Sequence, residues 1–109
     1  MIIGYARTST VDQEAGLEAQ IRDLKAAGAE KVFTEQTSAK GRRDALSQTL
    51  DYLREGDTLL VTKLDRLARS IRDLMDIVDK VRAKQASLRI LAMDLDTSNA
   101  TGKLMLGIL

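Results

Sequence analysis

Hydroxyl and cationic side chains carry the chemistry available to this 109-residue chain, because its sequence contains neither histidine nor cysteine. A Ser-His-Asp relay, a thiol nucleophile and a Cys/His zinc site are therefore excluded. Ser9 follows Arg7 by two residues, and a second cationic group comprises Lys63, Arg66 and Arg69. A serine attacking a phosphodiester needs the charge that develops on the phosphoryl oxygens to be neutralised, and the planar, permanently charged guanidinium suits that need. These residue types together favour phosphoryl transfer at a serine.

Taken singly, each of these residues also has an ordinary structural interpretation. Ser9 is placed to cap the first predicted helix, and Asp65 to cap the third. Arg66 and Arg69, three residues apart, would ordinarily form a solvated helix face whose ion pairs contribute little. Tyr5 lies in a predicted strand, where an aromatic residue is normally part of the core, so we do not interpret it as a nucleophile. Only the combination favours a site.

The elements that would position these residues alternate along the chain. Apolar runs predict strands over 1–6, 31–34, 58–62 and 88–93, and spacings of three and four predict helices over 12–27, 46–53 and 71–81. Gly28 is expected to end the first helix, and Gly56-Asp57 to turn the chain into the third strand. This alternation predicts a three-layer α/β fold, with a four-stranded, mostly parallel sheet and helices on both faces.

Ligands of open parallel sheets bind beyond the carboxyl ends of the strands. The first predicted strand is followed by Arg7, Ser9 and Gln13, and the second by Glu35 in a loop from 35 to 42, with Ser38 and Arg43 near the far side of that loop. The third strand is followed by Lys63, Asp65, Arg66 and Arg69, and the fourth by Asp94 and Asp96. We expect the cations to gather at one edge of the molecule. The net charge is only +1, so a basic face would come from this placement rather than from the total.

Two segments resemble signatures of the serine site-specific recombinases, the resolvase/invertase family. The run Tyr5–Thr10, with Asp12, Gln13 and Gln20, resembles the family's opening motif, and Lys63–Arg69 resembles its second signature. Two shorter segments, Phe33–Glu35 and Arg43–Leu46, fall in order between these signatures. Gly102-Lys103 resembles the start of the family's long helix. The resemblance covers essentially the whole chain. Glu35 departs from it, because the family more often has an aspartate there.

The resemblance implies a reaction and a role for each matched residue. Ser9 attacks the DNA phosphate, becomes joined to the 5′ phosphate and leaves a 3′ hydroxyl, and neither a metal nor another cofactor is used. Arg7, Arg66 and Arg69 contact the scissile phosphate, and Arg43 completes the set. Asp65 transfers a proton or orients an arginine. The supporting positions are Gln13, Gln20, Glu35 and Lys63.

The resemblance also implies partners and an organisation of the chain. Double-stranded DNA is the expected substrate, and a homo-oligomer, a dimer to a tetramer, is the expected assembly. Residues 1–100 are expected to form the catalytic domain and 101–109 to begin a truncated dimerisation helix, with the DNA-binding region missing. No apolar run approaches the roughly 20 residues that span a bilayer, and the first residues lack the features of a secretory signal. A cytoplasmic location is therefore expected.

Two other functions are open from the sequence. Asp94-Leu95-Asp96 follows a strand, as does the magnesium-binding acidic pair of topoisomerase–primase folds, although that chemistry also needs a glutamate where this chain has Arg7 and Ser9. Alternatively, the domain is a catalytically inactive partner that only assembles. The sequence leaves open whether the family subgroup is resolvase, invertase, transposase or large integrase.

Overall fold

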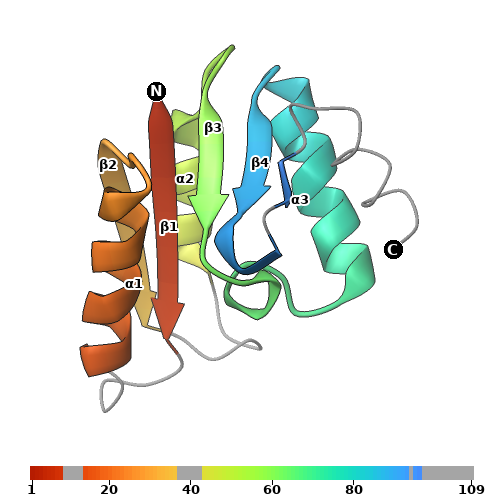
Figure 1. The fold of residues 1–109 in the computed structure, drawn as a ribbon. Coiled ribbons are helices and arrows are strands. Elements are labelled where there is room, and N and C mark those ends of the chain that lie inside the picture. The colour runs from red at the N-terminus through yellow and green to blue at the C-terminus, as the bar shows by residue number, and fades with distance from the viewer. Residues whose placement is uncertain (9–13, 37–42, 94, 97–109) are drawn as a thin grey trace.

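A parallel sheet forms the middle layer of the computed structural model, which describes residues 1–8, 14–36, 43–93 and 95–96 (Figure 1). Its strands are β1 (Ile2–Thr8), β2 (Lys31–Gln36), β3 (Thr58–Val61), β4 (Ser87–Ile90) and β5 (Leu95–Asp96). They lie in the order β2-β1-β3-β4-β5. The first four are parallel, and the short β5 pairs antiparallel with β4. The predicted four-stranded parallel sheet is confirmed, with β5 added at one edge.

Helices cover both faces of this sheet, as predicted. They are α1 (Glu14–Ala26), α2 (Asp44–Tyr52) and α3 (Ile71–Ala83), and the described residues also form the short 3₁₀ helices η2 (Leu64–Arg66) and η3 (Leu91–Met93). Figure 1 shows α1 in front of the sheet and α2 and α3 on the opposite side. The domain therefore has three layers and an apolar core on each side of the sheet.

The alternation of side chains along the strands divides the apolar residues between these two cores. On β1, Ile3 and Tyr5 pack with residues of α2 and α3, whereas Ala6 packs with Leu17 and Leu24 of α1. Successive residues of a strand point to opposite faces, so one strand contributes to both layers. This explains why the central strands read as nearly continuous apolar runs.

The fourth strand is shorter than its apolar run predicted. β4 ends at Ile90, and η3 then turns the chain so that β5 returns beside it. The Ala92 N–H donates to the Thr62 carbonyl oxygen at 2.9 Å, which fixes this turn to the end of β3. The prediction of a strand through Met93 was wrong because a short apolar run does not by itself distinguish a strand from a helical turn.

Helix ends follow the predicted turn chemistry with one correction. Gly28 has φ +106° just after α1, and Gly56 has φ +84° before β3, as expected of glycines at such turns. The cap of α3 is Ser70, whose Oγ accepts the Asp73 N–H, rather than Asp65. Asp65 is too far upstream because η2 and a connecting segment precede the helix. In the described part of the chain, every helix is too short or too polar to span a membrane.

The contact between β1 and α1 gives a prediction about stability. A Cβ on Gly4 would lie 3.2 Å from both Leu24 Cδ1 and Val32 Cγ2, whereas a Cβ on Gly16 meets nothing within 4 Å. Gly4→Val is expected to lower the free energy of unfolding by about 1–3 kcal/mol through overpacking. The control Gly16→Ala, on exposed helix surface, should raise it by up to about 1 kcal/mol. Urea denaturation would measure both, and an unchanged midpoint for Gly4→Val would contradict this packing.

Candidate functional site

Arg7 joins the end of β1 to the segment that follows β3. Its Nη2 donates to the Asp65 carbonyl oxygen at 2.7 Å and its Nε to the Arg66 carbonyl oxygen at 3.4 Å. β1 lies between β2 and β3, and in a sheet of this order the crevice forms where β1 and β3 lead to opposite sides. The first and second sequence signatures therefore meet at this crevice, through hydrogen bonds between residues 58 and 59 positions apart.

Gln20 holds the same strand end from the side of α1. Its Nε2 donates to the Arg7 carbonyl oxygen at 2.9 Å, and its Oε1 accepts the Arg7 N–H at 3.2 Å. The side chain is buried, and the backbone of Arg7 satisfies both the donor and the acceptor of its amide. The structure thus brings Gln20 to Arg7, where it replaces the hydrogen bonds that a neighbouring strand would supply.

Glu35 lies in β2 rather than in the predicted loop, and it is buried. Its Oε1 accepts the Tyr5 O–H at 2.5 Å and its Oε2 accepts the Ala45 N–H at 2.8 Å. α2 has no hydrogen bond from the side chain of its own N-cap residue, Arg43, so Glu35 satisfies one of its first N–H groups. The prediction of a loop from 35 was wrong because strand pairing with β1 continues through Gln36.

The assignment of Tyr5 to the core is confirmed, since its side chain is fully buried. Burial, together with the hydrogen bond to Glu35, raises the pKa of its phenol above the ordinary value. The phenol therefore remains protonated and donates to the carboxylate. Sequence reasoning did not anticipate this hydrogen bond, because nothing in the local pattern of a strand indicates a partner 30 residues away.

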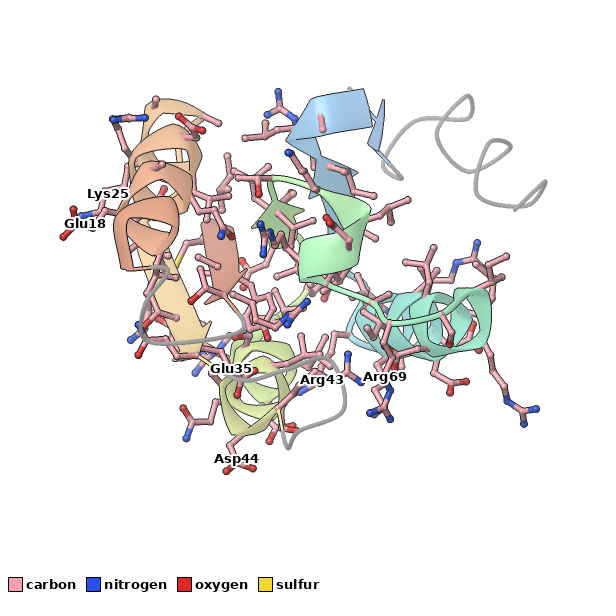
Figure 2. All side chains as sticks on the ribbon, turned by 90° about the horizontal axis from the view of Figure 1, so that it is seen from below. Glu18, Lys25, Glu35, Arg43, Asp44 and Arg69 are labelled. Carbon is pink, nitrogen blue, oxygen red and sulfur yellow. The ribbon has the colours of Figure 1, made fainter. Side chains whose placement is uncertain are left out.

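Arg43 and Asp73 form a bidentate ion pair between α2 and α3. Arg43 Nη1 and Nη2 lie 2.7 and 2.8 Å from Asp73 Oδ2 and Oδ1, and Nη1 also donates to the Leu67 carbonyl oxygen at 3.0 Å. Asp73 Oδ2 accepts the Arg69 N–H as well, at 3.0 Å. Figure 2, which looks onto the carboxyl ends of the strands, shows Arg43 and Arg69 close together at this junction.

These contacts shift the titration of both partners. The hydrogen bond with Asp73 raises the pKa of Arg43, and the hydrogen bond with Arg43 lowers the pKa of the Asp73 carboxyl despite its partial burial. Asp73 was missed as a site residue in the sequence. The available signal was Ser70-Ile71-Arg72-Asp73, the spacing of a helix capping box, which predicts a helix start but not an arginine partner.

Arg66, the last residue of η2, and Lys63, the residue before that helix, lie beside α1 instead. Both line a hollow of about 210 Å³ together with α1 residues that include Gln20 and Asp23. Arg69 instead lines an apolar hollow of about 290 Å³ beside α3. The predicted cations therefore divide into two groups. Lys63 and Arg66 lie beside α1, Arg43 and Arg69 lie near the starts of α2 and α3, and residues of η2 line both hollows.

Several predicted residues lie outside the described part of the chain. They are Ser9, Gln13, Ser38 and Asp94. Asp65 is described: its carbonyl oxygen orients Arg7, while its side chain is exposed. Within the described residues there is no group of three or more His, Cys, Asp or Glu that could hold a metal ion.

The ion pair predicts a pH-dependent loss of stability. Because the pKa of Asp73 is lowered on folding from 3.8, the pair stabilises the fold above that pH, and the contribution is lost as pH falls through the folded-state pKa. At neutral pH, Asp73→Asn should lower the free energy of unfolding by about 1–3 kcal/mol, and the difference from wild type should shrink below pH 4.

Asp23→Asn is the matched control for this prediction. Asp23 pairs with Arg22 at 3.8 Å with both side chains largely exposed, so its removal should change stability by only a few tenths of a kcal/mol. Denaturation of the three proteins between pH 2.5 and 7 would test this. A difference between Asp73→Asn and wild type that stays constant over this range would contradict the assignment.

Similar proteins identify the family of the chain. The family model described as Resolvase, N terminal domain, matches residues 2–109. The integrase-like protein y4lS of Sinorhizobium fredii is 47% identical over 111 residues, which cover 97% of this chain and 60% of that protein. The DNA-invertase of Escherichia phage P1 is 41% identical over 104 residues, covering 94% of this chain and 55% of the invertase. The chain thus spans a little over half the length of these relatives.

A solved structure agrees with the sequence comparison. The crystal structure of the N-terminal catalytic domain of TP901-1 integrase matches with a TM-score of 0.83 and 30% sequence identity, over 98% of this chain and 88% of that one. The fold and the sequence lead to the same assignment: this chain belongs to the resolvase N-terminal domain family of the serine recombinases.

Proposed function

We propose that this chain is the catalytic domain of a site-specific DNA recombinase that cleaves and rejoins DNA strands through a covalent phosphoserine at Ser9. One observation carries the proposal. Arg7, two residues before Ser9 in sequence, hydrogen-bonds to the main chain of Asp65 and Arg66 in the second signature. The segment that leads to the serine and the segment that carries the arginines are thereby held together at the β1/β3 crevice, where ligands of such sheets bind.

In the proposed reaction the Ser9 hydroxyl attacks the phosphorus of a DNA phosphodiester. A bond forms between Ser9 Oγ and phosphorus, the bond to the 3′ oxygen breaks, the serine loses its proton and the 3′ oxygen gains one. The product is a 5′-phosphoserine ester and a free 3′ hydroxyl. Because an ester replaces an ester, the 3′ hydroxyl of a new partner strand reverses the step. This scheme uses neither a metal nor a nucleotide.

The arginines would neutralise the charge that develops on the phosphoryl oxygens. Arg43 and Arg69 approach from the side of α2 and α3, and Arg66 from the side of α1, so a phosphate bound over η2 lies between cations on both sides. Arg7 would contribute charge from the end of β1, while its hydrogen bonds to the Asp65 and Arg66 carbonyl oxygens hold η2. Gln20 and Glu35 support the ends of β1 and α2, Lys63 adds charge beside Arg66, and Gln13 supports Ser9. Asp65, whose side chain is exposed, would transfer a proton or orient an arginine.

The organisation of the whole protein is part of the proposal. Residues 1–100 form the catalytic domain, and 101–109 begin a dimerisation helix that leads to a DNA-binding region in a longer protein. The share of the relatives that this chain covers, 60% and 55%, supports that division. Double-stranded DNA is the substrate, a homo-oligomer carries out strand exchange, and the protein acts in the cytoplasm at the nucleoid.

The role of Ser9 is tested by its replacement in the full-length protein. Ser9→Ala should abolish strand cleavage and leave site binding nearly unchanged, because only a hydroxyl is lost. A nicked suicide substrate should trap wild-type protein on the 5′ end of the DNA, and peptide mapping should locate the linkage at Ser9. Ser47→Ala, an exposed serine on α2, is the control and should cleave normally. Cleavage blocked by EDTA, without an adduct on Ser9, would refute the proposal.

The arginine roles give a second prediction with a distinct readout. Arg66→Ala and Arg69→Ala should each lower the cleavage rate by about a hundredfold or more, since each removes a charge directed at the phosphate. Single-turnover cleavage of labelled half-site DNA would measure this.

Under a magnesium mechanism with Asp94 and Asp96, Asp94→Ala and EDTA would stop the reaction, and Ser9→Ala would be tolerated.

The 109 residues alone are expected to bind DNA weakly and to recombine nothing. A net charge of +1 gives little affinity for phosphates, and what there is falls further as salt rises. A gel-shift titration at physiological salt would test this, and tight sequence-specific binding would contradict it.

A further inference from the structure

The Arg43–Asp73 pair links α2 and α3 through Arg43, an arginine that the proposed reaction would use. Arg43 is the N-cap residue of α2, and Asp73 lies in the first turn of α3. Asp73 also accepts the backbone N–H of Arg69. One carboxylate therefore fixes an arginine side chain from one helix and the main chain of a second arginine before the other helix.

The hydrogen bonds to Arg43 use only part of its guanidinium. Of the five N–H donors of an arginine, Nη1 directs its donors to the Leu67 carbonyl oxygen and Asp73 Oδ2, and Nη2 directs one donor to Asp73 Oδ1. The Nε–H and the second Nη2–H remain, and they lie along the other edge of the planar group. Among the described residues, no acceptor contacts that edge. Such an edge is a fork that fits two oxygens of one phosphate.

Burial of the pair restricts the orientation of the Arg43 guanidinium. Both side chains are 14% exposed, so water competes poorly for the hydrogen bonds between them. The Asp73 carboxylate also interacts with the charges of both Arg43 and Arg69 and offsets their mutual repulsion. Without it, Arg43 would have one fixed acceptor, the Leu67 carbonyl, and could rotate about that single contact.

We infer that Asp73 is a positioning residue for strand cleavage: it clamps Arg43 by one edge so that the other edge is presented to the scissile phosphate. This inference rests on the proposed function. Two other roles for the pair make different predictions. If Asp73 instead occupied Arg43 in competition with DNA, its removal would increase DNA affinity or cleavage. If it only stabilised the fold, its removal would lower the free energy of unfolding and leave cleavage by the folded protein unchanged.

Cleavage kinetics of the full-length protein separate these roles. Asp73→Asn keeps the backbone N–H that caps α3 through Ser70 but loses the charge and one carboxylate oxygen. It should lower single-turnover cleavage of half-site DNA by about tenfold to a hundredfold, as misplacement of a catalytic group does, with site binding unchanged. Asp76→Asn, an exposed carboxylate in the same helix, is the matched control and should cleave as wild type does.

A double-mutant cycle then tests whether Asp73 acts through Arg43. Arg43→Lys keeps the positive charge but loses the fork, so it should show a loss similar to that of Asp73→Asn. The double variant should be no slower than Arg43→Lys alone. Multiplied effects, or an increase in cleavage or DNA affinity on Asp73→Asn, would overturn the inference. Should Ser9→Ala still cleave, the proposed function fails; if Ser9→Ala is inactive while Asp73→Asn matches Asp76→Asn, only this inference fails.

The clamp itself is measurable in the 109-residue chain without any reaction. In ¹⁵N NMR spectra, slow rotation about the guanidinium C–N bonds should give Arg43 resolved Nη signals in the wild type and in Asp76→Asn. These signals should merge in Asp73→Asn, and the Arg69 amide should shift as its acceptor changes. Identical Arg43 signals in Asp73→Asn and wild type would overturn the clamp.

Discussion

Because Arg7 is only 8% exposed, its guanidinium must be satisfied within the protein, and the carbonyl oxygens of Asp65 and Arg66 meet part of that need. A buried charge without partners would cost several kcal/mol, so the fold is committed to keeping η2 against the end of β1. The same constraint determines where the arginines of the second signature lie relative to the first. Gln20 secures the strand end from the side of α1 by pairing with the Arg7 backbone. The site geometry thus follows from satisfying one cation.

The other charged contacts extend this arrangement to the helices. Glu35 joins β1, β2 and α2 through the Tyr5 hydroxyl and the Ala45 N–H, and Asp73 joins α2 to α3 through Arg43. Glu35 lies at the start of α2 and Asp73 at the start of α3, where unpaired N–H groups favour negative charge. The layers are therefore held together at the carboxyl edge of the sheet by polar contacts and over the rest of each face by apolar packing. Substitutions at this edge should disturb function more than substitutions at the opposite edge.

Sequence reasoning succeeded where local pattern decides structure and failed where distant side chains meet. The apolar runs gave the four parallel strands, and the strand-end rule placed Arg7, Arg43, Arg66 and Arg69 at one end of the sheet. The division of those cations by η2 was not foreseen, because a linear sequence does not tell on which side of a turn a side chain lies. Glu35 was placed in a loop because it begins the polar stretch 35–42, whereas in the structure it is the buried end of a strand. Its partners, Tyr5 and Ala45, become evident only once the strands are paired.

A nearly neutral domain can still prepare a strong phosphate site if its cations are fixed before DNA arrives. The contribution of an arginine to catalysis depends on its orientation at the moment of reaction, and a group already held in place needs no reorganisation. In this chain the ordering is accomplished on folding, through carbonyl oxygens for Arg7 and a carboxylate for Arg43. Each carboxylate that orients a cation also lowers the net charge, which weakens attraction to DNA at long range. Under the proposed function, such a domain would gain geometry at the expense of affinity for DNA, and a DNA-binding region in a longer protein would supply that affinity.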